Sequence, residues 1–400
     1  MTLSGDTGLA EARGALRDEQ RLARERLGVM RSISSADVLA AALAHADRRE
    51  HAGEVRGDHV RYAPFRYALA TERQRWARTR EVLQRVAPGP DEDGRQLEMV
   101  ARQAASVEMV LRGDCGGAAD RRLQALCDRL LLGTLPSFDL AASSRRHGDH
   151  YLVLVSAGLI DFTYQLAKAT LLSWKPAASP RGGVSFRCER DDVEAVLAET
   201  PVPLWLLRTT LEHYLFQGIP RAPKAPAAPA QIHPPLETLT AFNERFVIAH
   251  EIAHALHEHL DIVHSGLGAR GEEFAADVWA LRWTMDGAHL LDDMAPNIAA
   301  QGAFFTLTVL DVLHQALDLA RHGAVRTGAR FAGHPPTEQR LATLREAYAE
   351  IVTRADGNLS VRAALLPAET LSLLWQRLLG DGSTSPWRNR RLHASWDERP

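Results

Sequence analysis

The interpretation of this 400-residue chain depends on residues 242–256, which read FNERFVIAHEIAHAL. The apolar residues of this stretch fall on related faces of a helix: Phe242, Ile248, Ile252 and Leu256. Residues four apart lie on one side of a helix, so His250 and His254 can point at the same metal ion. Glu251 is rotated by about 100° from His250, which places its carboxylate beside the ion rather than on it.

A third ligand is expected further along the chain. Residues 265–271 (SGLGARG) predict a glycine-rich turn, and residues 272–277 (EEFAAD) follow it. If two antiparallel helices meet at this turn, Glu273 lies nearly level with His254. Two imidazoles and one carboxylate leave a position open for water, which is the arrangement of catalytic zinc, and we expect one Zn²⁺ per chain. Asp277, one turn after Glu273, is placed to accept the free ring N–H of a ligand histidine.

Other interpretations of these residues remain open. Glu272 is the alternative ligand, because it is only one position from Glu273. Acidic residues are also favoured at a helix N-terminus by the helix dipole, with no metal involved. His257 lies one turn after His254, but additional histidines near such a pair are more often packing or surface residues.

The composition indicates an ordinary globular protein, with 46% hydrophobic and 24% charged residues. A net charge of −3 disfavours a nucleic-acid partner. Three widely spaced cysteines are consistent with a reducing, cytoplasmic location. The apolar stretches 151–174 and 303–313 are interrupted by charge or too short to span a bilayer, so we expect buried core and no membrane partner. The sequence makes no prediction of the oligomeric state.

The pattern along the chain predicts a mainly helical fold with a small β-sheet. Helices are expected in residues 1–135 and 190–217, the latter with Trp205, Leu206, Leu211 and Leu215 on its apolar side, and again from about residue 236 onward. Strands are expected at 151–155 and, more weakly, at 183–187. Six prolines in the Pro/Ala-rich segment 218–236 predict an extended connection, either a solvated linker or a lid. We therefore expect an N-terminal helical region (1–135), a catalytic domain (136–355) and a C-terminal helical extension (356–400).

Three motifs together resemble the gluzincin peptidases typified by HtpX and the type I CAAX prenyl endopeptidases. They are HEIAH at 250–254, the Glu-x-x-Ala-Asp pattern at 273–277, and GHPPTEQRL at 333–341. The resemblance implies a zincin-like α+β domain, a role for His334 in stabilising the oxyanion, and an ion pair between Arg340 and Glu273. It also implies that residues 155–160 (VSAGLI) contain an edge strand able to bind an extended peptide. The chain is similar as well to ImmA/IrrE-type regulators and Lit-type peptidases, which cut one specific intracellular protein.

These patterns predict a zinc-dependent endopeptidase that acts on an intracellular protein or peptide, with zinc-bound water activated by Glu251. A zinc-binding regulatory protein with little or no proteolytic activity is the alternative. A third interpretation is a helical protein in which the motif is accidental and no metal binds.

Overall fold

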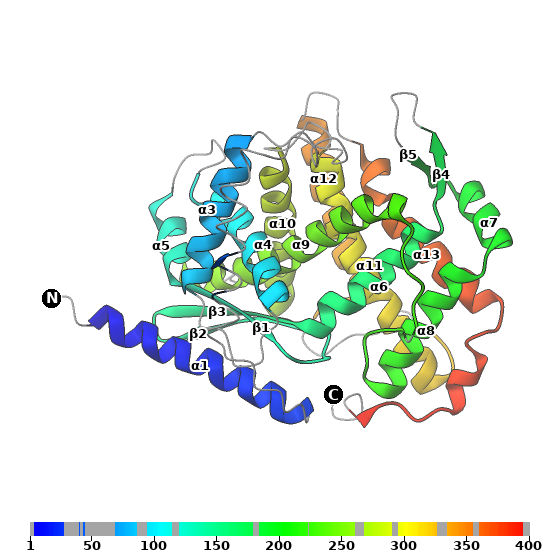
Figure 1. The fold of residues 1–400 in the computed structure, drawn as a ribbon, viewed down its shortest axis with the longest axis horizontal. Helices are drawn as coiled ribbons and strands as arrows, with labels where there is room; N and C mark the ends of the chain where they lie inside the picture. The colour runs from blue at the N-terminus through cyan, green and yellow to red at the C-terminus, as the bar shows by residue number, and fades with distance from the viewer. Residues whose placement is uncertain are drawn as a thin grey trace. The chain divides into compact units, whose positions relative to one another are not determined.

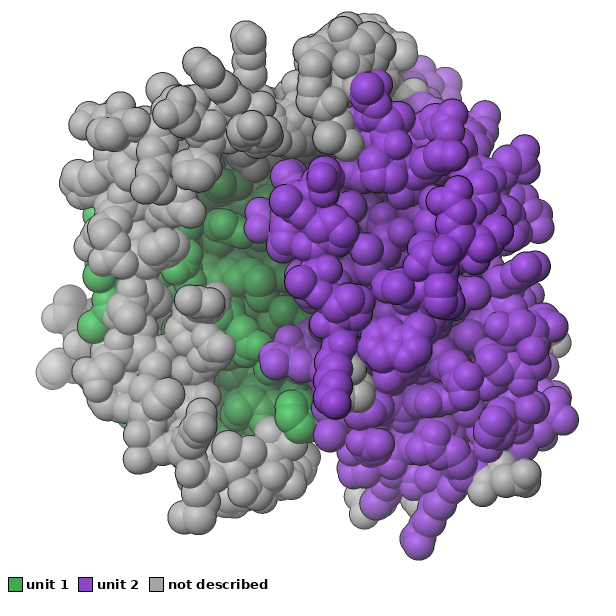
Figure 2. Space-filling view, turned by 45° about the vertical axis from the view of Figure 1, so that its right-hand side comes forward, with its two compact units in different colours: residues 1–160, 244–296 green, residues 161–243, 297–400 purple. Residues whose placement is uncertain are grey.

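The computed structural model describes residues 4–27, 40, 43–44, 69–85, 94–113, 120–178, 184–222, 224–260, 268–289, 295–325, 334–354 and 360–394. These residues are mainly helical and include a small mixed sheet, as expected (Figure 1). The chain groups into two compact units, which Figure 2 colours separately. Unit 1 contains Met1–Ile160 and Glu244–Pro296, and unit 2 contains Asp161–Asn243 and Asn297–Pro400. The expected division into regions 1–135, 136–355 and 356–400 stays a prediction.

Unit 1 combines helices with a three-stranded sheet. Its elements are α1 (Ser4–Leu27), α3 (Leu69–Arg85), α4 (Gly94–Leu111), α5 (Arg121–Arg129), β1 (Leu130–Leu135), β2 (Ala142–His147), β3 (His150–Ser156), the part of α9 (His233–His259) from Glu244 onward, and α10 (Gly268–His289). The strand order is β1-β3-β2, with β1 parallel and β2 antiparallel to β3. β3 confirms the strand expected at 151–155.

Two expectations about this sheet were wrong. Residues 155–160 (VSAGLI) do not contain an edge strand: residues 155–156 end β3, which pairs on both sides and is the central strand, and residues 157–160 begin α6. Peptide addition would therefore have to use β1 or β2. β1 lies within residues 1–135, which were expected to be helical. A short leucine run is compatible with either state, and the pairing of Leu131 with Leu152 decides for strand.

Helices pack on both faces of the sheet. On one face, Ala12 and Leu16 of α1 form a buried cluster with Leu131, Leu152 and Leu154. Side chains alternate along a strand, so Tyr151 projects from the opposite face. There its ring meets the ring of His259, at the end of α9, with the centroids 5.8 Å apart. The sheet thus holds the C-terminal end of α9, the helix that carries the HEIAH motif.

Unit 2 is mostly helical. Its elements are most of α6 (Ala157–Leu172), the hairpin of β4 (Lys175–Ala178) and β5 (Val184–Arg187), α7 (Arg190–Glu199), α8 (Val202–Gln217), η2 (Ala230–Ile232), the start of α9, most of α11 (Ala295–His322), α12 (Thr337–Arg354), α13 (Val361–Gly380) and η3 (Ser385–Asn389). The weaker strand prediction is confirmed by β5. The helix expected at 190–217 is present as two helices, α7 and α8. Trp205 was assigned to the apolar side but is 40% exposed, whereas Leu206, Leu211 and Leu215 are buried.

The Pro/Ala-rich segment is only partly the extended connection that was expected. Pro234 and Pro235 lie in the first turn of α9, where the missing amide donor costs nothing. Two side chains of α6 also fix the segment. Lys168 donates a hydrogen bond to the carbonyl oxygen of Pro226, and Arg221 forms an ion pair with Asp161.

Among the described helices, one is long and apolar enough to cross a membrane, at Asn297–His322 in α11. The buried core helix of a globular protein has the same properties. Residues 303–309 in this helix are indeed buried, as expected for the stretch 303–313.

Candidate metal centre

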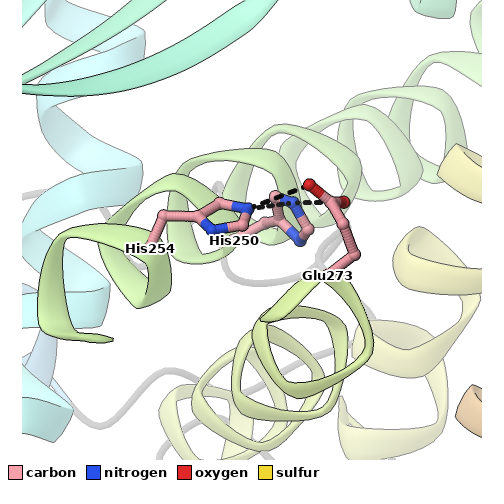
Figure 3. Close-up of side chains that lie close together, drawn as sticks. All are labelled: His250, His254 and Glu273. Atoms are coloured by element: carbon pink, nitrogen blue, oxygen red, sulfur yellow. Dashed lines mark hydrogen bonds and ion pairs between the residues drawn. The ribbon is translucent and has the colours of Figure 1, made fainter. Parts of the chain in front are cut away.

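Two helices of unit 1 bring two histidines and a glutamate together (Figure 3). His250 and His254 project from α9 and Glu273 projects from α10, with the three side chains pointing toward one another. The Nε2 atoms of the two histidines are 3.1 Å apart. Glu273 Oε2 is 3.5 Å from His250 Nε2, and Glu273 Oε1 is 3.4 Å from His254 Nε2. The predicted ligand set is therefore brought together by helical spacing for the two histidines and by the position of α10 beside α9 for Glu273.

These distances fit a tetrahedral metal ion. Zinc bonds to imidazole nitrogen and carboxylate oxygen are about 2.0–2.2 Å long, so two tetrahedral ligand atoms lie about 3.4 Å apart. The three measured separations, 3.1, 3.4 and 3.5 Å, cluster around that value. Among the described residues, these three form the group of histidine, cysteine and acidic side chains with the spacing to hold a metal ion.

Asp277 supports His250 from the side away from the group. Its Oδ1 atom is 3.0 Å from His250 Nδ1, and the residue is fully buried. A carboxylate at this distance favours the tautomer with the proton on Nδ1, in which Nε2 could serve as a metal ligand. Glu273 and Asp277 are one turn apart on α10, which explains how one helix supplies both carboxylates.

The three side chains differ in exposure. Those of His250 and Glu273 are 10% and 9% exposed, whereas that of His254 is 23% exposed. Glu251 is 9% exposed. His254 is thus the most exposed of the three candidate ligands.

Contacts with α4 hold both helices of the site. Arg245 of α9 donates from Nε to Gln103 Oε1 of α4 over 3.1 Å. A Cβ at Gly287 of α10 would lie 3.6 Å from the carbonyl oxygen of Ser106 of α4, so the two helices approach closely there.

The glycine-rich turn expected at 265–271 needs correction in its second half. α10 already begins at Gly268, and Glu273 consequently lies in its second turn rather than at its start. Residues 265–267 lie outside the described residues.

The two residues proposed from the GHPPTEQRL motif, His334 and Arg340, belong to unit 2. His334 is exposed and directly precedes the two prolines before α12, while Arg340 is 8% exposed in the first turns of that helix. The expected ion pair between Arg340 and Glu273 and the expected role of His334 at the oxyanion stay predictions.

No pattern in the sequence singled out His314, which lies beside this motif. Its Nδ1 atom is 3.3 Å from Thr337 Oγ1. Burial, aided by the charges of Arg340 and His334, lowers the pKa of His314 to about 3. His314 is thus neutral at ordinary pH. Its position within the apolar pattern of α11 offered no signal of a polar role.

Comparisons with protein-family models, with curated proteins and with solved structures gave no match for this chain. The site therefore has to be interpreted from its own chemistry.

Proposed function

We propose that this protein is a zinc-dependent endopeptidase with a zincin-like catalytic region. The observation that supports it best is the set of separations among His250 Nε2, His254 Nε2 and the Glu273 carboxylate, all between 3.1 and 3.5 Å. Two histidines and one carboxylate would hold zinc with a position left for water, as catalytic sites require. Bound zinc would lower the pKa of that water and polarise the carbonyl of the scissile bond.

The protein's own side chains would do the remaining work. Glu251 follows His250 on α9 and is the candidate general base, which accepts a proton and later delivers it to the leaving amine. Asp277 would hold the ring of His250 in one tautomer and one orientation. His334 would donate to the developing oxyanion, and Arg340 would fix the carboxylate of Glu273. These last two roles follow from the resemblance of 333–341 to the gluzincin peptidases.

The proposed substrate is a protein or peptide in the cytoplasm. The resemblance to ImmA/IrrE-type and Lit-type proteins favours one specific intracellular protein over general degradation. The prenylated substrates of the CAAX enzymes are not part of the proposal.

The decisive experiment compares wild type with Glu251→Gln on unfolded casein, with and without a chelator. Wild type should give fragments that the chelator suppresses. Glu251→Gln should retain about one zinc per chain by elemental analysis and give no fragments, because the amide cannot accept the proton. Full activity of this variant would exclude the mechanism. Zinc bound by wild type without cleavage of casein or of any protein in a cell lysate would favour the regulatory alternative.

A further inference from the structure

The two histidines of the group differ in how their rings are held. His250 directs Nε2 toward Glu273 and Nδ1 toward Asp277, so both ring nitrogens have a carboxylate oxygen within 3.5 Å. His254 also directs Nε2 toward Glu273, at 3.4 Å. Among the described residues, no carboxylate lies within ion-pair distance of Nδ1 of His254. Metal-binding histidines are normally oriented by a second group. Two rings lie edge-to-face with the ring of His254: that of His250, itself a member of the group, with the centroids 4.7 Å apart, and that of His257.

His257 is placed to give that support. It is three residues after His254 on α9 and therefore lies on the same side of the helix. Its side chain is buried, with 6% of the residue exposed. The rings of His254 and His257 are perpendicular, at 90°, with their centroids 6.5 Å apart. This is an edge-to-face arrangement within the range at which aromatic rings stabilise each other.

His257 is not a fourth member of the ligand group. The described donor atoms close enough to share an ion belong to His250, His254 and Glu273. The position of His257 beside the more exposed histidine instead suits a residue that limits rotation of the His254 ring. The side chain of His254 is half-buried, at 23% exposed, whereas that of His250 is 10% exposed.

We infer that His257 is a positioning residue for His254: its ring holds the His254 imidazole edge-to-face in the orientation that the metal requires. This inference rests on the proposed zinc site but not on proteolysis. It assigns the two histidines separate supports, with Asp277 acting on His250 and His257 acting on His254.

The test measures zinc affinity by competition with a chromophoric chelator, using the full chain. His257→Leu fills a similar volume without a ring, and His257→Phe retains a ring. The leucine variant should bind zinc about 2- to 10-fold more weakly than wild type, as for the loss of one aromatic pair, and the phenylalanine variant should recover most of that loss. Asp277→Asn should weaken binding more, by about 10- to 100-fold, as for the loss of a carboxylate that orients a ligand histidine. Glu258→Ala removes an exposed residue of the same helical turn and should leave affinity unchanged.

Cobalt substitution separates positioning from a general loss of stability. The visible spectrum of bound Co²⁺ reports ligand geometry, so it should change for His257→Leu and be restored for His257→Phe. Wild-type affinity and spectrum in the leucine variant would overturn the inference, and so would equal losses in both variants. If wild type itself bound no zinc, the proposed function would fail first, and that result would be visible before any variant was made.

Discussion

At the scale of single residues, the choice between Glu272 and Glu273 shows how one position decides a ligand. Both oxygens of Glu273 lie within 3.5 Å of an imidazole nitrogen. Glu272 is rotated by about 100° around α10 and is partly exposed. We therefore predict that Glu273→Ala loses zinc, with affinity at least about 100-fold weaker, because a three-ligand site becomes a two-ligand site. Glu272→Ala should retain zinc. Elemental analysis after gel filtration measures the zinc content of both variants, and loss of zinc only in Glu272→Ala would make Glu272 the ligand instead of Glu273.

Glu244, two turns before His250 on α9, predicts a pH dependence of stability. Burial raises its pKa from 4.5 to about 8, against the opposing charge of Arg102. The folded protein therefore keeps a proton that the unfolded chain releases between these two values. This group's contribution to stability is complete below about pH 4.5 and is lost as the pH rises to about 8.

Glu244→Gln removes that titration. As the pH rises from 5 to 8, the free energy of unfolding of the variant should increase relative to that of wild type. The total increase should be on the order of a few kcal/mol, the amount that corresponds to such a pKa difference. Urea unfolding of both proteins at several pH values measures the gain. A difference that stays constant over this range would show that the carboxyl group titrates in the folded protein as it does in the unfolded chain.

At the scale of elements, a close backbone approach between α9 and α11 should be intolerant of one methyl group. A Cβ at Gly302 would lie 2.5 Å from the backbone carbon of Phe242 and 2.7 Å from the amide nitrogen of Asn243. Gly302→Ala should therefore lower the free energy of unfolding by about 1–3 kcal/mol, since one helix must move. At Gly380, the last residue of α13, nothing lies within 4 Å of an added Cβ. Gly380→Ala is the matched control and should be neutral or stabilising by up to about 1 kcal/mol. Equal urea midpoints for the two variants would contradict the close approach.

Secondary-structure elements were predictable where the local sequence pattern alone decides between helix and strand. The HEIAH helix follows from its periodicity, and the strand at 150–156 from its β-branched apolar run. β1 was not predictable, because Leu130, Leu131 and Leu132 suit a helix as well as a strand, and only pairing with β3 fixes them. That same pairing makes β3 central rather than an edge, which no property of residues 150–156 reveals.

The candidate site, too, is predictable where local spacing decides and not where tertiary packing decides. Helical spacing is enough to place His250 and His254 together, and the expectation of two antiparallel helices is enough to bring Glu273 level with them, as observed. Which histidine receives Asp277, and which neighbour supports the other, depends on side-chain directions and on how α10 lies against α9. From the sequence, Asp277 was expected to support one of the two ligand histidines without a choice between them, and His257 was expected to be a packing or surface residue.

At the scale of the whole molecule, the three candidate ligands and the supporting Asp277 lie in a single unit. His250, His254, Glu273 and Asp277 all belong to unit 1, whose part of α9 is followed along the chain by α10. A metal that binds the folded site and not the unfolded chain stabilises by RT ln(1 + [L]/Kd), about 2.7 kcal/mol at a free concentration 100 times Kd. That stabilisation acts first on the segments that carry the ligands.

Hydrogen exchange with and without zinc should locate this effect. Adding zinc to metal-free protein should slow amide exchange most in residues 244–259 and 268–289, because local opening of either helix breaks the ligand set. Exchange in α13 of unit 2, residues 361–380, should change much less. Glu273→Ala provides the control and should show no zinc-dependent slowing in α9 or α10. Slowing that is equally large in α13, or that persists in Glu273→Ala, would mean that zinc binds elsewhere or that the three side chains do not hold it together.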